Sequence, residues 1–61
     1  MKITLKAARI NAGLDQTEVS REIGVNPSTV SSWENGKTKP SLDNFRKLCA
    51  LYDCKEEEIK L

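Results

Sequence analysis

Apolar residues recur along most of the chain at intervals of three or four, which is the spacing of one face of an α-helix. No stretch alternates apolar and polar residues long enough to indicate a strand. The pattern therefore predicts an all-α fold, a compact bundle of five short helices without a linker or an internal repeat. The expected helices cover residues 4–12, 16–23, 27–35, 42–52 and 55–60.

The helix ends carry clear local signals. Asp15 followed by Glu18 has the spacing of a capping box, and Ser41 is a good N-cap for the fourth helix. Asn26 stands before Pro27, whose missing N–H costs nothing at the first helical position. The first three helices are each followed by a residue suited to a left-handed C-terminal turn: Gly13, Gly24 and Gly36.

The second and third helices are separated by only two or three residues, so they must be joined by a tight turn at Gly24. This predicts a helix-turn-helix unit over about residues 16–35, with its second helix at about 27–35. Trp33 is interpreted as a core residue rather than a stacking platform. The residues of the unit expected to point to one interior are Val19, Ile23, Val25, Val30 and Trp33, and those of the fourth helix are Leu42, Phe45, Leu48, Cys49 and Tyr52.

If Val30 and Trp33 face inward, the opposite side of the third helix carries short, mostly hydroxyl-bearing side chains. Such a helix can enter a groove about 12 Å wide, and hydroxyls can bond to base edges. The base-facing candidates are therefore Pro27, Ser28, Ser31 and Ser32.

Phosphate-binding candidates flank this helix. Lys37 and Lys39 follow it in a basic loop, with Asn35 at its end and Asn26 at its start. Gln16 lies in the first turn of the second helix, where free N–H groups favour a phosphate. The two sides of the helix-turn-helix unit could thus be fixed on a DNA backbone.

Composition narrows the choice of function. The chain has 61 residues, which fits one domain over residues 1–61, and its net charge is only +1 because an acidic C-terminal segment offsets basic residues elsewhere. Cys49 and Cys54 have no histidine to complete a zinc set, so we expect no metal and no cofactor, and we interpret the thiols as reduced bystanders. No signal peptide or membrane span is evident, and we expect a cytoplasmic, nucleoid-associated protein.

Residues 13–45, "GLDQTEVSREIGVNPSTVSSWENGKTKPSLDNF", resemble the phage repressor and Cro family of Xre-type regulators. The resemblance implies that Gln16 binds phosphate and supports the recognition helix, that Asn35, Lys37 and Lys39 bind phosphate, and that the residues facing the bases are those already named. It also implies an ion pair between Arg9 and Glu34. Several relatives have glutamine where Pro27 and Ser32 stand here, so amide readout of adenine is lost at both positions.

The sequence favours one of three classes of function. The favoured hypothesis is a sequence-specific binder of double-stranded DNA, a repressor acting as a homodimer on an inverted repeat, with Leu51, Ile59 and Leu61 as candidates for the dimer contact. The alternative is a protein-interaction module, antitoxin-like or adaptor-like, on the same scaffold. An enzyme has no support, because the chain has no histidine and no nucleophile constellation. No small-molecule ligand is evident.

Overall fold

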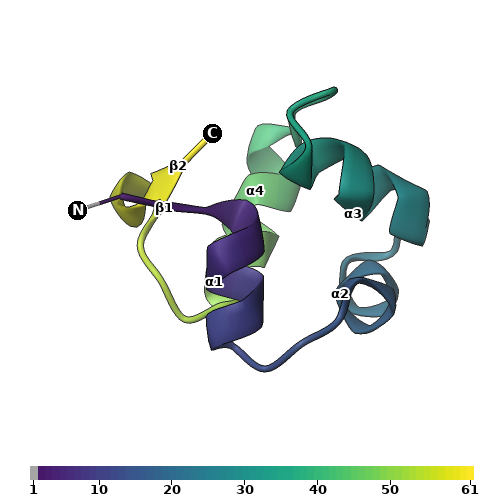
Figure 1. Cartoon of the computed structure of the whole chain (residues 1–61), viewed down its shortest axis with the longest axis horizontal. Coiled ribbons are helices and arrows are strands. Elements are labelled where there is room, and N and C mark those ends of the chain that lie inside the picture. The colour runs from purple at the N-terminus through teal and green to yellow at the C-terminus, as the bar shows by residue number, and fades with distance from the viewer. Residues whose placement is uncertain (1) are drawn as a thin grey trace.

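The computed structural model describes residues 2–61 as four α-helices and a small parallel strand pair (Figure 1). The elements follow one another as β1 (Ile3–Thr4), α1 (Leu5–Asn11), α2 (Gln16–Ile23), α3 (Pro27–Glu34), α4 (Leu42–Leu51), the 3-10 turn η1 (Glu56–Glu58) and β2 (Ile59–Lys60). The helical helix-turn-helix architecture expected from the sequence is confirmed. The number of helices is not, because a fifth α-helix does not form.

The predicted helix over residues 55–60 is replaced by η1 and β2. A helix there would be a turn and a half long with a single strong apolar residue, Ile59, and such a short helix is marginal in water. In the extended conformation Ile59 instead pairs with Ile3 and is only 4% exposed. The exchange places the two ends of the chain side by side in a parallel pair, which local spacing could not predict.

The helix starts agree with their sequence signals. Asp15 accepts a hydrogen bond from the Glu18 N–H at 2.7 Å, and Glu18 accepts one from the Asp15 N–H at 3.0 Å, so the capping box is complete. The Ser41 hydroxyl accepts from the Asn44 N–H at 3.2 Å. Asn26 is different, because its side chain makes no capping bond and Pro27 alone marks the start of α3.

Three of the four α-helices, α1, α3 and α4, end in the pair of hydrogen bonds of a Schellman motif, in which the chain turns through a left-handed residue. The chain also turns through a left-handed residue after α2, but both N–H groups there donate to the Ser20 carbonyl. In α4 the left-handed residue is Asp53, with φ of 53°. The Asp53 N–H donates to Ala50 at 3.3 Å and the Cys54 N–H donates to Cys49 at 3.0 Å. The other three left-handed positions are Gly13, Gly24 and Gly36.

Asp53→Gly is expected to raise the free energy of unfolding by about 0.5–1 kcal/mol, because glycine adopts positive φ without strain and the change removes an acid from the negative end of a helix. Urea unfolding followed by circular dichroism measures the gain. Asp53→Asn removes the charge with less relief of the backbone and should gain less. A similar gain from Asp53→Ala would contradict the backbone explanation, since alanine does not favour this conformation.

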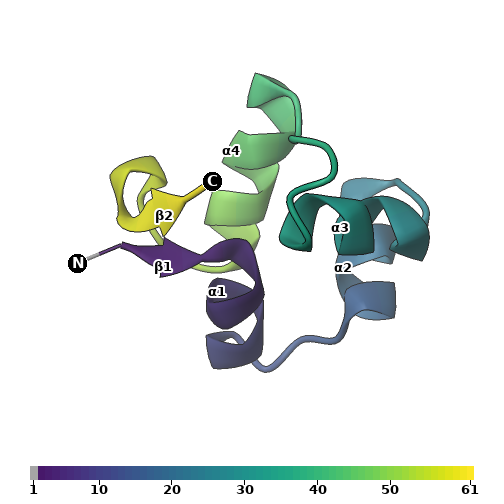
Figure 2. The ribbon, with the colours of Figure 1, turned by 45° about the horizontal axis from the view of Figure 1, so that its top comes forward.

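The core lies where α1, α2, α3 and α4 meet, and β2 closes one side (Figure 2). Val19 from α2, Val30 from α3 and Leu48 from α4 are at most 1% exposed, so each of these three helices contributes one fully buried side chain. Leu42, which the periodicity placed on the inward stripe, is instead 57% exposed. The first turn of α4 extends past the core, so its apolar residue meets solvent. The buried apolar residues are Leu5, Ala8, Val19, Ile23, Val30, Trp33, Leu48, Cys49, Tyr52 and Ile59.

Candidate nucleic-acid interface

The turn between α2 and α3 fixes the angle at which α3 is presented. Gly24 has φ of 89°, and both its N–H and that of Val25 donate to the Ser20 carbonyl, at 2.8 and 3.0 Å. Ser20 itself is buried and its hydroxyl donates to the Thr17 carbonyl at 2.7 Å, which leaves no unpaired polar group under the turn. The two helices therefore leave this corner in a defined direction, with α3 across α2 (Figure 2).

One side of α3 is anchored in the core and the other is open. Val30 is 1% exposed and Trp33 is 8% exposed. Pro27 and Ser28 are exposed, whereas Ser31 and Ser32 are half-buried at the edges of the open side. All four residues predicted to face DNA bases are thus accessible at least in part, and none is in the core.

The end of α3 holds the basic loop in place. Gly36, with φ of 76°, reverses the chain so that the N–H groups of Lys37 and Thr38 donate to the Ser32 carbonyl at 3.0 and 3.4 Å. Lys37 and Lys39 are exposed directly beyond this turn. These hydrogen bonds fix the backbone of the lysine loop relative to α3, the helix that carries the serines.

Asn35 is exposed at the C-terminal end of the open side. Its amide donates to the Ser31 hydroxyl at 3.3 Å. Asn26 is also exposed at the opposite end, and its side chain is not used in capping. Both amides are therefore accessible at the two ends of α3.

A buried carboxylate joins three helices behind this surface. Glu34, whose side chain is 3% exposed, accepts from the Nε of Arg9 at 2.7 Å and from an outer nitrogen of the same guanidinium at 3.2 Å. The Gln16 amide donates to Glu34 Oε1 at 3.0 Å. Arg9 also donates to the Leu14 carbonyl at 3.0 Å. The network fixes the C-terminal end of α3 against α1 and the first turn of α2.

The charges in this network affect neighbouring groups. The hydrogen bond to Glu34 raises the pKa of Arg9 above its ordinary value, so the guanidinium stays protonated. Burial, together with the negative charge of Glu34, raises the pKa of Tyr52 to about 12. At neutral pH the interior beside α3 thus contains the ion pair of Arg9 with Glu34 and the neutral phenol of Tyr52.

Gln16 makes the kind of contact with the recognition helix that the family resemblance implied. It was expected to bind phosphate, and the structure commits one of its two amide hydrogens to Glu34. The second hydrogen remains for another acceptor, because the amide nitrogen carries two. No local pattern could reveal the contact, since the two residues are 18 positions apart.

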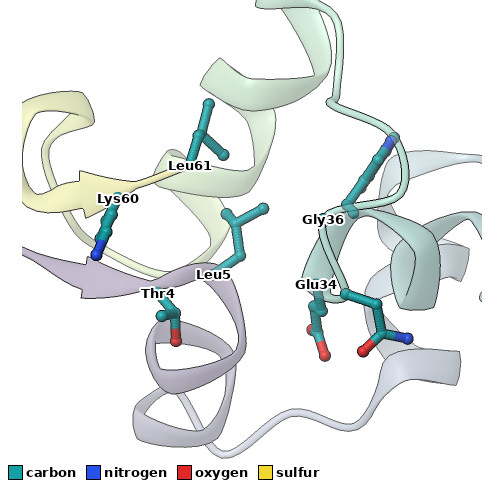
Figure 3. A pocket seen from close by; sticks show the side chains of 8 residues that line it. Thr4, Leu5, Glu34, Gly36, Lys60 and Leu61 are labelled. Carbon is teal, nitrogen blue, oxygen red and sulfur yellow. The ribbon is translucent and has the colours of Figure 1, made fainter.

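A shallow hollow of about 250 Å³ lies between the end of α3 and the two strands. Figure 3 shows Lys60 and Leu61 on one side, Thr4 and Leu5 at the start of α1, and Glu34 and Gly36 across from them. Its wall includes Leu61, which is 55% exposed. Ile59, a predicted dimer contact, is instead in the core, and Leu51 is half-buried.

Residues 2–61 contain no group of three or more His, Cys, Asp or Glu side chains that could hold a metal ion. None of the helices formed by these residues is long and apolar enough to cross a membrane.

Comparison with known proteins shows a family match and a similar transcriptional regulator. Residues 5–59 match the model of a family described as helix-turn-helix. The chain is 30% identical over 59 residues to an uncharacterized HTH-type transcriptional regulator of Archaeoglobus fulgidus, an alignment that covers 97% of this chain and 83% of the relative. No solved structure matches the chain.

Proposed function

Because this chain belongs to the Cro/C1-type helix-turn-helix family of DNA-binding transcription regulators, we propose that it is a sequence-specific repressor that binds double-stranded DNA through the major groove. One observation carries the proposal: α3 is anchored by Val30 and Trp33, and its open side bears only small side chains and ends in an exposed lysine loop. Short side chains allow close approach to base edges, and the lysines fix the helix on phosphates.

In the proposed complex the residues have separate roles. Pro27, Ser28, Ser31 and Ser32 face the bases, with Pro27 limited to apolar contact such as a thymine methyl. The residues assigned to phosphates are Gln16, Asn26, Asn35, Lys37 and Lys39. Arg9 and Glu34 support α3 from behind without touching DNA.

The proposal includes a homodimer on an inverted repeat, because a domain of this size covers little DNA alone. Two exposed leucines suit the contact between copies. Leu42 begins α4 directly after the lysine loop, and Leu61 lines the hollow beside Gly36. Related half-sites would then lie about 34 Å apart along the DNA.

Lys37→Ala and Lys39→Ala are each expected to flatten the slope of log affinity against log salt concentration by about one unit, because each removes one phosphate contact. Gel-shift titrations over a range of salt concentrations measure the slope. Lys55→Ala removes the same charge from an exposed residue just before η1, outside the helix-turn-helix unit, and should leave the slope unchanged. If neither loop variant changes the slope, the phosphate assignment is wrong. A wild-type protein without salt-dependent DNA binding would instead favour the protein-interaction alternative.

Ser32→Ala is expected to change base preference by roughly 1–3 kcal/mol at particular positions of the site, because the proposal assigns its hydroxyl to a base edge. Selection from random DNA, with wild type and variant in parallel, shows the change. The wild-type selection should return an inverted repeat. Thr38→Ala, which alters a hydroxyl in the loop rather than on α3, serves as the control. Identical motifs from wild type and Ser32→Ala would remove Ser32 from the reading face.

A further inference from the structure

The two cysteines occupy paired positions around the end of α4. Cys49 lies in the last turn of the helix, and Cys54 is the first residue after the left-handed Asp53. The Cys54 N–H donates to the Cys49 carbonyl at 3.0 Å, and of the two bonds that close the Schellman motif this one spans more residues. In this motif the side chains at these two positions commonly pack on each other.

This hydrogen bond limits the distance between the two Cα atoms. Standard bond lengths allow at most about 7 Å between them across a bond of that length, and the bends at the carbonyl and amide shorten the span further. Disulfides form when the Cα atoms are about 4.4–6.8 Å apart. The hydrogen bond at the end of α4 therefore limits the two Cα atoms to a separation close to the range that a disulfide requires.

Both thiols are free and close together. Cys49 is buried and Cys54 is half-buried, and both line a hollow at the surface with Asp53 and Glu58. Each thiol also affects the pKa of the other. A small oxidant can therefore reach Cys54 first, with Cys49 directly behind it.

We propose that Cys49 and Cys54 are a modification site, at which a peroxide forms an intramolecular disulfide that fastens the C-terminal segment to α4. The Cys54 thiolate attacks the O–O bond of hydrogen peroxide, which gives a sulfenic acid and hydroxide. The Cys49 thiolate then attacks the sulfenic sulfur, the S–S bond forms and hydroxide leaves. The two thiol protons convert both hydroxides to water, so two thiols and one peroxide give one disulfide and two waters.

The surroundings make this site slow at neutral pH. Burial raises the pKa of Cys49 to about 11 and also raises that of Cys54. Since the thiolate is the nucleophile, the reaction rate should rise about tenfold per pH unit between pH 7 and 9. The charged groups around the thiols are Arg46 on α4, Asp53 and Lys55 in the turn, and Glu56, Glu57 and Glu58 in η1.

The disulfide would stabilise the tail. Cys54 leads through η1 into β2, whose Ile59 pairs with Ile3. Fastening Cys54 to α4 shortens the segment that must be ordered for this pairing. The two effects are linked. If the disulfide raises the equilibrium constant of folding by some factor, then folding raises the equilibrium constant of disulfide formation by the same factor.

Treatment of the full chain with hydrogen peroxide at pH 9, followed by iodoacetamide and trypsin, tests the proposal. The peptide of residues 48–55 contains both cysteines. It should lose two hydrogen atoms and resist alkylation, and the oxidised chain should melt at least about 5 °C higher than the reduced chain. A peptide with two alkyl groups, or disulfides only between chains, would overturn the proposal.

A second measurement separates the fold from sequence proximity. The equilibrium constant for forming the Cys49–Cys54 disulfide against glutathione is measured in the folded chain and in a synthetic peptide of residues 48–55. We expect the disulfide to be favoured at least tenfold more in the folded chain. Equal constants would show that the fold does not favour the disulfide, and would refute the proposal that it fastens the C-terminal segment to α4. Cys54→Ser, which keeps the backbone hydrogen bond, should show neither the hydrogen loss nor the melting shift.

Discussion

Glu34→Ala is expected to lower the free energy of unfolding by about 3 kcal/mol, because it leaves the Arg9 guanidinium and the Gln16 amide without their common acceptor. Removing one partner of a buried pair costs about 3–5 kcal/mol. The lower end applies here because water is close on every side of so small a domain. A domain of 61 residues has roughly 3–9 kcal/mol in total, so much of its stability would be lost.

Urea unfolding followed by circular dichroism measures this loss. Glu34→Gln keeps an acceptor of the same shape and should cost less than Glu34→Ala. The double variant Arg9→Met with Glu34→Leu replaces both charges by apolar groups and should recover most of the stability, since buried pairs can often be replaced in this way. A loss below about 1 kcal/mol for Glu34→Ala would mean that the pair behaves like an exposed one.

Trp33→Ala is expected to lower the free energy of unfolding by about 3–4 kcal/mol, because it removes the largest side chain that fixes α3 to the core. Trp33 is 8% exposed and is the single tryptophan of the chain, so circular dichroism rather than fluorescence must follow the unfolding. The α3 helix would lose its inward anchor, and DNA binding should fall with the folded fraction.

Trp33→Phe is the matched control, since it keeps an aromatic ring of smaller volume and should cost well under half as much as Trp33→Ala. The two variants also separate the core interpretation from a stacking role. A Trp33→Ala protein with unchanged stability and lost DNA binding would indicate that the ring contacts the nucleic acid instead.

The parts of the fold that sequence predicted best are those decided by neighbouring residues. The helix over residues 16–23 has the expected bounds because its capping box and its terminal glycine act within a few positions. The helix over 27–35 ends one residue earlier, at Glu34, because Asn35 serves as its C-cap. The expected helix over 4–12 is shorter at both ends, since Thr4 belongs to β1 and caps α1, and Ala12 is its C-cap.

The parts that local sequence signals could not predict depend on residues far apart in the chain. The pairing of Ile3 with Ile59 has no local signal, and it converted an expected helix into a strand. The Gln16 contact with Glu34 likewise depends on how α2 and α3 cross. The Arg9 pair with Glu34 was implied only by family resemblance, because spacing cannot bring two helices together.

The placement of the predicted interface residues follows from helical periodicity. Helical periodicity correctly predicted that Val30 and Trp33 are buried. Because Ser28 is on the opposite face of the same helix, the same periodicity predicted that Ser28 is exposed. Periodicity failed for Leu42 because it describes a helix face and not where the core ends along the helix.

The parallel pairing of β1 and β2 also decides where a fusion partner or affinity tag can be attached. Because the strands run in the same direction, the chain enters the pair at one end and leaves it at the other. A tag joined to Leu61 would begin in the hollow beside Asn35 and Gly36, next to the lysine loop. A tag before Lys2 would begin at the opposite end of the strands. Purified material for the DNA-binding measurements should therefore carry its tag at the amino end.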